Sequence, residues 1–432
     1  MQKHTETLFF SFTGQNPSPT HQKPTTMTRL SEDAIANILS RLHVKDLLRY
    51  RCVSKPWRFL VDSPRFIKMH LNHSKETHSN STLILGDQRL LHSVDLDTLD
   101  SPVRLVSPIY DGGEIEILGC CNGLLALEFA NGGTVIWNPS TRKYRKVPIS
   151  GLIDLPFPDN LYEYGIVGFG YDPVNDDHKL ARMVHYFKKD VRSVHLFHSE
   201  VKVYSLNFNT WKRVCDFPYQ GCHRGKSILV GNSFHWLMGL QYGTKSSTIT
   251  VAFDFVTEKY HQIPRANRNT KGKDYYSTMT ELGGWLCDVV KFGKYSEKAD
   301  YVDFWVMKEY GVKESWTKLL TVVPSNVTGS FKSLMPLAYF KSSHQILFDQ
   351  DDEKFMLYDL EKKEAKSVKN YPRSFQKIAC VRGLIGVGGG DEPNSGKKAE
   401  EDGNKKNKEK DKQQPSGKKR DDFLSKGFKL VL

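Results

Sequence analysis

Histidine and cysteine are among the side chains in this sequence that could hold a metal ion or act as nucleophiles. His195 and His198 lie three residues apart, and His185 precedes them. A pair at this spacing suits a metal when both residues lie on one face of a helix. The apolar neighbours of these histidines are typical of a strand or loop instead, so we expect no metal site and no cofactor.

The seven cysteines form no recognisable framework. They are odd in number and none are spaced as Cys-x-x-Cys, which argues against a zinc finger, a RING domain or a set of disulfides. We expect reduced, partly buried thiols at Cys52, Cys120, Cys121, Cys215, Cys222, Cys287 and Cys380.

Motifs for covalent catalysis and phosphate binding are missing from the sequence. There is no Gly-x-Ser-x-Gly motif, and the glycines of 386–390 come before a polar stretch rather than before a helix. The sequence therefore favours a protein that is not an enzyme.

The net charge of +13 is not gathered into one basic stripe. Residues 30–71 carry eight basic side chains against four acidic ones, and residues 391–432 carry twelve against nine. A surface that follows a nucleic-acid backbone has a more uniform sign, so we expect no specific nucleic-acid partner, although attraction to acidic partners stays open. No apolar run approaches the roughly twenty residues that span a bilayer, and no secretory signal is evident, which favours a location inside the cell.

The elements that would position a site begin with four short helices predicted over residues 30–71. Ser31, Ser54 and Ser63 can each cap a helix start, and apolar residues recur behind them at helical spacing. A unit of about forty residues is too small to be comfortably stable alone. Part of its apolar surface is therefore expected to rest on its own chain or on a partner.

The order of residues in this stretch resembles the F-box. Where that family has Leu-Pro, Ile-Leu-x-x-Leu-Pro, Leu-Leu and Val-x-Lys-x-Trp, the chain has Leu30-Ser31, Ile38-Leu39-Ser40-Arg41-Leu42-His43, Leu47-Leu48 and Val53-Ser54-Lys55-Pro56-Trp57. Ser31 and His43 replace the two family prolines. The resemblance implies an F-box over residues 29–75 that docks on a Skp-type adaptor and, through it, on cullin and RING subunits.

The adaptor-binding residues that this resemblance implies are Leu30, Ile38, Leu39, Leu42, Val44, Leu47, Leu48, Val53 and Trp57. Some of these must belong to the internal core of the helices instead. Val53 and Trp57 are expected to serve both purposes.

Residues 81–390 change to short runs of β-branched and aromatic residues broken by turn residues, which predicts a mainly β domain. A phrase recurs here: an apolar strand, a polar residue, a turn, an aromatic residue and a proline. Its copies align at Asn138, Ser205, Asp254, Val306 and Asp359, with intervals of 67, 49, 52 and 53 residues. This period is close to that of kelch repeats and predicts a kelch-like β-propeller of six or seven blades. Its tryptophans and tyrosines are interpreted as packing between blades, with ligand stacking as the alternative.

Several phrases of this region resemble the plant F-box-associated interaction domain. They are Asn122-Gly123-Leu124-Leu125, Trp137-Asn138-Pro139-Ser140-Thr141, Gly168-Phe169-Gly170-Tyr171-Asp172-Pro173, Lys202-Val203-Tyr204-Ser205-Leu206, His235-Trp236 and Trp305-Val306-Met307-Lys308-Glu309-Tyr310-Gly311-Val312. The ending 419–432 is similar to that of a plant F-box protein of defence control. Each phrase is loose, but their order is specific.

Composition predicts disorder in the leader 1–28 and in a mixed basic and acidic tether over 391–422. The apolar segment 423–432 differs from this tether, and we expect it to dock back on the β domain. Lysine and arginine clusters at 405–406 and 418–420 permit nuclear import, so the expected location is cytoplasm and nucleus.

The resemblance implies the substrate-recognition subunit of an SCF-type (Skp-cullin-F-box) ubiquitin ligase, which recruits client proteins for ubiquitination and proteasomal degradation. Plant immune receptors are the clients that the resemblance suggests, as part of a negative control of defence, but no residue identifies the client or the loops that bind it. A propeller scaffold without ligase function is the alternative in the binding class. A propeller hydrolase or oxidase is the enzymatic one.

Overall fold

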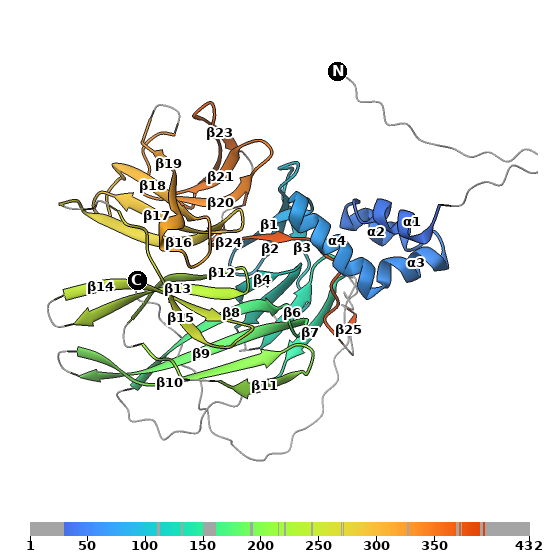
Figure 1. Cartoon of the computed structure of the whole chain (residues 1–432), viewed down its shortest axis with the longest axis horizontal. Helices are drawn as coiled ribbons and strands as arrows, with labels where there is room; N and C mark the ends of the chain where they lie inside the picture. The colour runs from blue at the N-terminus through green and yellow to red at the C-terminus, as the bar shows by residue number, and fades with distance from the viewer. Residues whose placement is uncertain are drawn as a thin grey trace, which may run out of the picture. The chain divides into compact units, whose positions relative to one another are not determined.

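The structure is a computed structural model that describes residues 30–109, 113–130, 133–149, 161–190, 193–214, 216–219, 222–242, 245–268, 270, 272–325, 328–368, 371–372, 374–388 and 392–393. The leader 1–28 and the segments 394–422 and 423–432 lie outside these residues, so the expectations for them stay predictions. Within the described part, helices come first along the chain and antiparallel sheets follow (Figure 1).

Four helices form the amino-terminal domain: α1 (Glu32–Leu39), α2 (Val44–Tyr50), α3 (Lys55–Asp62) and α4 (Pro64–Thr77). The hydroxyl oxygens of Ser31, Ser54 and Ser63 accept hydrogen bonds from backbone amides three residues further on, at 3.2, 3.3 and 3.3 Å. These bonds satisfy donors that a helix start leaves unpaired. The serines therefore set the starts of α1, α3 and α4, as the sequence predicted.

The β domain consists of six sheets, each of which is one blade. From the innermost to the outermost strand, blade 1 contains β24 (Gln376–Val381), β1 (Ser81–Gly86), β2 (Leu91–Asp95) and β3 (Val103–Leu105). Blade 2 contains β4 (Ile115–Cys121), β5 (Leu124–Phe129), β6 (Thr134–Asn138), β7 (Lys143–Val147) and β25 (Glu392–Pro393). Blade 3 contains β8 (Leu161–Asp172), β9 (Asp177–Asp190), β10 (Ser193–Ser205) and β11 (Thr210–Arg213).

Blade 4 contains β12 (Cys222–Val230), β13 (Ser233–Tyr242), β14 (Lys245–Asp254) and β15 (Tyr260–Ile263). Blade 5 contains β16 (Tyr275–Leu282), β17 (Trp285–Phe292), β18 (Tyr301–Met307) and β19 (Trp316–Val322), with a short 3-10 turn, η1 (Lys313–Ser315), before β19. Blade 6 contains β20 (Leu334–Phe340), β21 (Gln345–Gln350), β22 (Lys354–Asp359) and β23 (Glu364–Val368).

The ring closes through a strand from the end of the β domain. The innermost strands contact one another in the order β4, β8, β12, β16, β20 and β24, and β24 contacts β4 again. Strand β24 also pairs with β1, which places Cys380 opposite Thr82 and makes blade 1 from two distant parts of the chain. The propeller prediction is confirmed, and the number of blades is six.

The recurring sequence phrase marks the third strand of a blade. Its aligned positions all lie on third strands, and most are the last residue before the turn to the fourth strand. There a side-chain oxygen accepts backbone amides of the turn; Asn138 Oδ1 accepts from Ser140 at 2.8 Å and Asp254 Oδ1 from Val256 at 2.9 Å. Asp95 makes the same turn in blade 1, a sixth copy that the alignment missed. These local bonds compete with strand extension and fix where the hairpin turns.

The aromatic residue and the proline of the phrase connect neighbouring blades. Trp211 on β11 donates its indole N–H to the carbonyl oxygen of Pro148, which follows blade 2, at 2.7 Å. Trp316 on β19 makes the equivalent bond to Pro264, after blade 4, at 2.8 Å. The outer edges of consecutive blades are therefore held together by the same pair of residue types, as the packing interpretation expects.

Two glycines of β8 receive aromatic rings from blade 4. A side-chain carbon added at Gly168 would lie 2.5 Å from the ring of Phe234, and one added at Gly170 would lie 2.3 Å from the ring of Phe255. Both rings are buried. Because Gly168 and Gly170 have no side chains, the rings of blade 4 pack directly on the backbone of β8.

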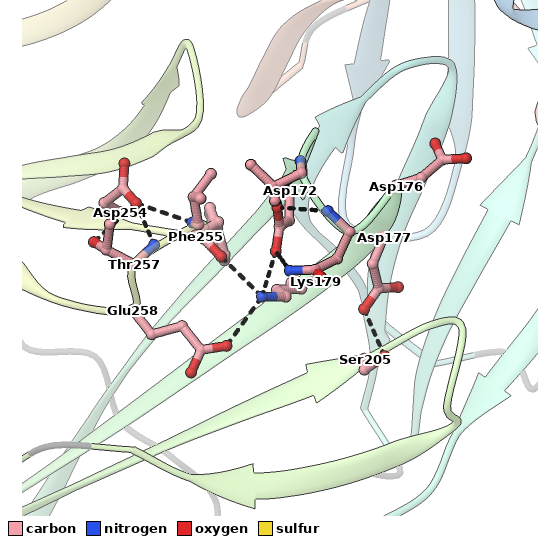
Figure 2. Close-up of polar contacts among 12 residues, drawn as sticks. Asp172, Asp176, Asp177, Lys179, Ser205, Asp254, Phe255, Thr257 and Glu258 are labelled. Carbon is pink, nitrogen blue, oxygen red and sulfur yellow. Dashed lines mark hydrogen bonds and ion pairs between the residues drawn. The ribbon is translucent and has the colours of Figure 1, made fainter.

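A buried lysine joins the same two blades beside these rings (Figure 2). The ammonium of Lys179 on β9 lies 2.8 Å from Asp172 Oδ2, 2.9 Å from the carbonyl oxygen of Phe255 and 3.0 Å from Glu258 Oε1. Burial alone would lower the pKa of Lys179, but hydrogen bonds and charges from Asp172 and Glu258 outweigh it and raise the pKa. Since all three acceptors are within hydrogen-bond distance, the charge is compensated where it is buried.

The structure corrects the expectation for two cysteines. Cys120 on β4 and Cys380 on β24 form a disulfide, with Cα atoms 6.0 Å apart, across the joint between blades 2 and 1. Cys121 and Cys287 are free and buried, and Cys52 is free and exposed. Spacing along the sequence could not suggest a pair separated by 260 residues. Only ring closure brings the two strands together.

The tether boundary also differs from the prediction. Strand β25 lies within residues that composition assigned to the tether, yet Glu392 pairs with Tyr144 and Pro393 with Lys143 on the edge of β7. An edge strand offers unpaired backbone groups to any extended segment nearby, whatever its composition.

Replacing Gly170 with alanine should destabilise the propeller by about 1–3 kcal/mol, because the added methyl group overlaps the ring of Phe255. Gly165→Ala is the matched control, since it lies on the same strand with no heavy atom within 4 Å of the added carbon. Urea unfolding followed by tryptophan fluorescence measures both. Equal stability of the two variants would contradict the proposed packing.

Stability should fall with acid because of His178. Asn122 Nδ2 lies 3.2 Å from His178 Nε2 and can only donate, so this buried ring is neutral, and burial lowers its pKa to about 4. Between pH 6.5 and 4, His178 is protonated in the unfolded chain but stays neutral in the folded chain. The contribution of His178 to the free energy of unfolding is therefore complete above pH 6.5 and decreases as the pH falls towards 4. The loss is about 1.4 kcal/mol per pH unit from this residue. A His178→Gln variant should show a shallower slope in urea unfolding between pH 7 and 4.5; an unchanged slope would count against this assignment.

Candidate functional site

The helical domain has its own apolar core, and three of the nine predicted adaptor-binding residues belong to it. Leu39, Val44 and Leu47 are 3%, 1% and 0% exposed and pack with Val61 and Phe66. A partner could reach these side chains only if the helices moved apart. The sequence assigned them to a contact surface because they match the family pattern in order, and order alone does not separate the two faces of so short a helix.

The remaining six residues are accessible to different degrees. Leu30, Ile38 and Val53 are 62%, 53% and 63% exposed. Leu42, Leu48 and Trp57 are half-buried and pack on the helical core. The sequence suggested that Val53 and Trp57 each belong both to the helical core and to the contact surface. Val53 is not part of the core, whereas Trp57 contacts the core and keeps part of its surface open.

Two exposed aromatic residues of the helical domain are not among the residues that the F-box resemblance implied. Phe59 on α3 is 78% exposed, and Tyr50 at the end of α2 is 37% exposed, with its ring against Trp57 at 5.8 Å. Helical spacing could have found Phe59, because it lies off the stripe of Trp57, Leu60 and Val61. We call Leu30, Ile38, Tyr50, Val53 and Phe59 the apolar surface of the helical domain. Each of these side chains leaves a large apolar area in contact with water, which burial against a partner would remove.

A residue outside the helices caps α2. His43, which replaces a family proline, makes no capping bond with its side chain. Asn80, just before β1, accepts the backbone amide of Val44 through Oδ1 at 3.1 Å and donates through Nδ2 to Ser74 Oγ at 3.0 Å. The start of α2 is therefore fixed by the junction between α4 and the propeller.

The segment after β24, residues 382–387, connects the helices to the propeller, and we call it the closing segment. Leu384 in this segment belongs to the helical core, where it is 7% exposed. Asn138 Nδ2, at the end of β6, donates to the carbonyl oxygens of Gly383 and Ile385 at 3.1 and 2.8 Å. A side-chain carbon at Gly123 would lie 2.7 Å from the nitrogen of Gly383, so glycine is needed there.

Polar contacts at both ends support this connection. Arg382 pairs with Asp95 and hydrogen-bonds Thr82, both on blade 1. Lys68 on α4 forms an ion pair with Asp176, in the turn between β8 and β9, at 2.6 Å. The propeller residues in these contacts lie in or next to turns of two kinds. Gly123 and Asp176 lie between the first and second strands of a blade, and Asn138 and Asp95 lie at the end of a third strand, before the turn to the fourth. We call this side of the propeller the proximal face and the opposite side the distal face.

Two family phrases meet on the proximal face between blades 4 and 5. The hydroxyl of Tyr310, in the turn before β19, lies 2.7 Å from His235 Nε2 and 3.2 Å from His261 Nε2. His235 is fully buried, and burial lowers its pKa to about 4. The histidine of one phrase and the tyrosine of the other therefore form one joint between blades.

The described part of the chain contains His, Cys, Asp and Glu side chains that could be metal ligands. In that part, no three His, Cys, Asp or Glu side chains are grouped to hold a metal ion. His198 lies on β10 with its ring stacked 6.0 Å from Tyr186, and the side chain of His195 lies outside the description. None of the described helices is long and apolar enough to cross a membrane.

Fold and site together define a protein with a small helical domain, carrying exposed apolar side chains, joined to a six-bladed propeller. Two family models match the chain: the F-box domain over residues 27–69 and the F-box associated beta propeller domain over residues 90–381. The chain belongs to the family of F-box proteins with this propeller domain.

Curated relatives agree with this assignment over nearly the whole chain. The F-box protein CPR1 of Arabidopsis thaliana is 36% identical over 423 residues, covering 94% of this chain and 100% of the relative. The F-box protein At4g22390 of the same plant is 31% identical with the same coverage. The F-box/WD-40 repeat-containing protein 1, also from this plant, is 26% identical over 66% of the chain and 67% of the relative.

Replacing Leu384 with alanine should loosen the helical domain without opening every blade. Truncating a buried leucine costs about 2–5 kcal/mol, and the lost contacts here are with the helices. Hydrogen exchange measured by mass spectrometry should speed up in α1 to α4 far more than in blades 4 and 5. Val323→Ala, at an exposed position, is the control. Unchanged exchange in the helices would show that Leu384 is not part of their core.

Proposed function

We propose that this protein is the substrate-recognition subunit of an SCF-type ubiquitin ligase. In this role the helical domain binds a Skp-type adaptor, and through it cullin and RING subunits, while the propeller binds a client protein for ubiquitination and proteasomal degradation. The observation that carries the proposal is the apolar surface of the helical domain on a chain of the F-box family. The conclusion that such a surface needs a partner follows from the cost of leaving large apolar groups in water.

The separation between core and surface supports adaptor binding through exposed side chains. Leu39, Val44 and Leu47 hold the helices together, while Ile38, Val53 and Phe59 remain free to enter a groove on a partner. Helices that insert apolar side chains three to four residues apart into a groove are a common recognition mode. In this arrangement the core residues act as positioning residues for the ones that bind.

The closing segment supports a second part of the proposal, namely that client and ligase are held at a defined separation. Leu384, Asn80 and Lys68 each connect the helices to the propeller. A short, ordered connection raises the effective concentration of client lysines near the ligase more than a flexible one does. The protein itself then needs no catalytic groups, because partners perform the chemistry.

We also propose a class of client protein, a pathway and a cellular location. Similarity to the F-box protein CPR1 supports a role in plant defence, and we propose immune receptors as clients and cytoplasm and nucleus as the locations. The exposed propeller loops, rather than the helices, would then carry client specificity, since loops on a rigid scaffold are the usual place for recognition.

Substituting aspartate for Ile38 and Phe59 should abolish binding of a Skp-type adaptor, at least about a hundredfold in affinity, because each charge would have to be buried in an apolar groove. Both side chains are exposed, so the melting temperature should not change. Surface plasmon resonance with purified adaptor measures the binding. Aspartate at Leu39 or Leu47 would be less informative, since these positions are in the core.

Val312→Asp, an exposed apolar position on the propeller, serves as the matched control and should bind normally. Full adaptor binding by the Ile38 and Phe59 variant would contradict the proposed surface. Failure of the unmodified protein to bind any Skp-type adaptor would favour a propeller scaffold without ligase function.

A further inference from the structure

The strands of the propeller differ in length from one blade to the next, and the difference lies on the distal face. Strands β8, β9 and β10 contain 12, 14 and 13 residues, and β13 and β14 contain 10 each, whereas the strands of blade 6 contain five to seven. Figure 1 shows β9, β10, β13 and β14 as long arrows. Because β9 starts and β10 ends at proximal turns, the extra length extends on the distal side. Blades 3 and 4 are therefore longer on their distal side than blade 6.

An aromatic cluster lies at that distal end of blade 5. Tyr275 begins β16, Phe292 ends β17 and Tyr301 begins β18, so the backbone register places the three side by side. The rings of Phe292 and Tyr301 stack at 4.3 Å, and Tyr275 lies 6.2 Å from Phe292. On the other side of β16, Tyr276 lies 4.8 Å from Tyr295.

Three rings at this end of blade 5, on the two sides of β16, are open to solvent. Tyr275, Tyr276 and Tyr295 are 41%, 42% and 73% exposed. A tyrosine combines a broad apolar face with a hydroxyl group and loses little conformational entropy on binding, which is why it is frequent in recognition surfaces. We call Tyr275, Tyr276, Tyr295 and Lys273 the distal aromatic surface.

Positive charge lies in and directly under this surface. Lys273 lies over the rings of Phe292 and Tyr301 at 5.6 and 5.3 Å, and the guanidinium of Arg268 lies over Tyr275 at 5.6 Å. Arg268 and Arg265 both pair with the fully buried carboxylate of Asp288, at 3.2 and 3.3 Å. Their side chains are only 9% and 17% exposed.

The charge count of this region leaves a surplus of positive charge. The exposed cations Lys273, Lys294 and Lys298 are balanced in number by Asp274, Glu297 and Asp300. The buried pair of arginines has one carboxylate between them among the described residues. Burial lowers the pKa of Arg268, as expected where a guanidinium is incompletely compensated, although it remains charged. A charge beneath a surface is screened by salt less than one in open solvent.

We propose that the distal aromatic surface binds an acidic segment of the client protein, with carboxylates near Lys273 and Arg268 and apolar side chains on the tyrosine rings. Blade 4, whose strands β13 and β14 contain ten residues each, is the neighbour of blade 5 on one side. This inference deepens the proposed function and rests on it, since it names the chemistry of the client on the face opposite the helical domain.

The test uses the full chain purified with a Skp-type adaptor. The probes are two peptide arrays, one rich in Asp, Glu, Leu and Tyr, and one with the same sequences after exchange of Asp for Asn and Glu for Gln. The acidic array should bind, the amide array should bind at least about tenfold less, and added salt should weaken the binding.

Lys273→Gln combined with Tyr276→Ser should reduce binding of the acidic array about tenfold or more, with an unchanged melting temperature because both positions are exposed. Lys341→Gln is the matched control: it removes a cation that lies 4.9 Å over Trp285, but on the proximal face of the same region. It should leave peptide binding unchanged.

Equal binding of both arrays, no binding of either, or normal binding by the Lys273 and Tyr276 variant would each overturn the inference. If the adaptor stays bound in the same preparation while peptide binding fails, the inference about the distal face is wrong but the proposed function is not. Loss of the adaptor from the unmodified chain overturns the function itself.

Discussion

The closing segment is the constraint on which the rest of the structure depends. Strand β24 completes the ring, and within six residues the same stretch of backbone places Leu384 in the core of the helical domain. Asn138 and Gly123, from blade 2, hold this backbone by hydrogen bonds and by close approach. The residues that close the propeller and the residue that completes the helical core are therefore neighbours in the sequence, and neither domain has its full set of contacts without this segment.

The proposed division of labour follows from this constraint. The helices present apolar side chains at one end, while ordered contacts through Asn80, Lys68 and Leu384 fix the proximal face of the propeller to them. The distal face is the one that we propose for client recognition. It carries the longest hairpins and a cluster of tyrosines above buried arginines. A receptor that brings a client to a ligase needs this kind of polarity.

Much of the fold could be predicted because its signals are local. Serine caps define three helix starts, and Asx turns at positions such as Asn138 and Asp254 recur with the blade period. The features that were missed are those that depend on ring closure. Blade 1 combines residues from both ends of the domain, so its turn at Asp95 fell outside the alignment, and the pairing of Cys120 with Cys380 crosses the same joint.

The candidate site was predicted less well, for a related reason. Family order named exposed residues such as Ile38 together with buried ones such as Leu39 and Leu47, because a short helix matches the pattern on both faces and only packing decides which face is buried. Phe59 belongs to no family phrase and became visible only through its exposure. The most direct measurement is a cryo-EM structure of the full chain with a Skp-type adaptor. We expect adaptor contacts at Ile38, Val53 and Phe59 with Leu384 still in the helical core; an adaptor bound elsewhere, or helices detached from Leu384, would contradict the proposed function.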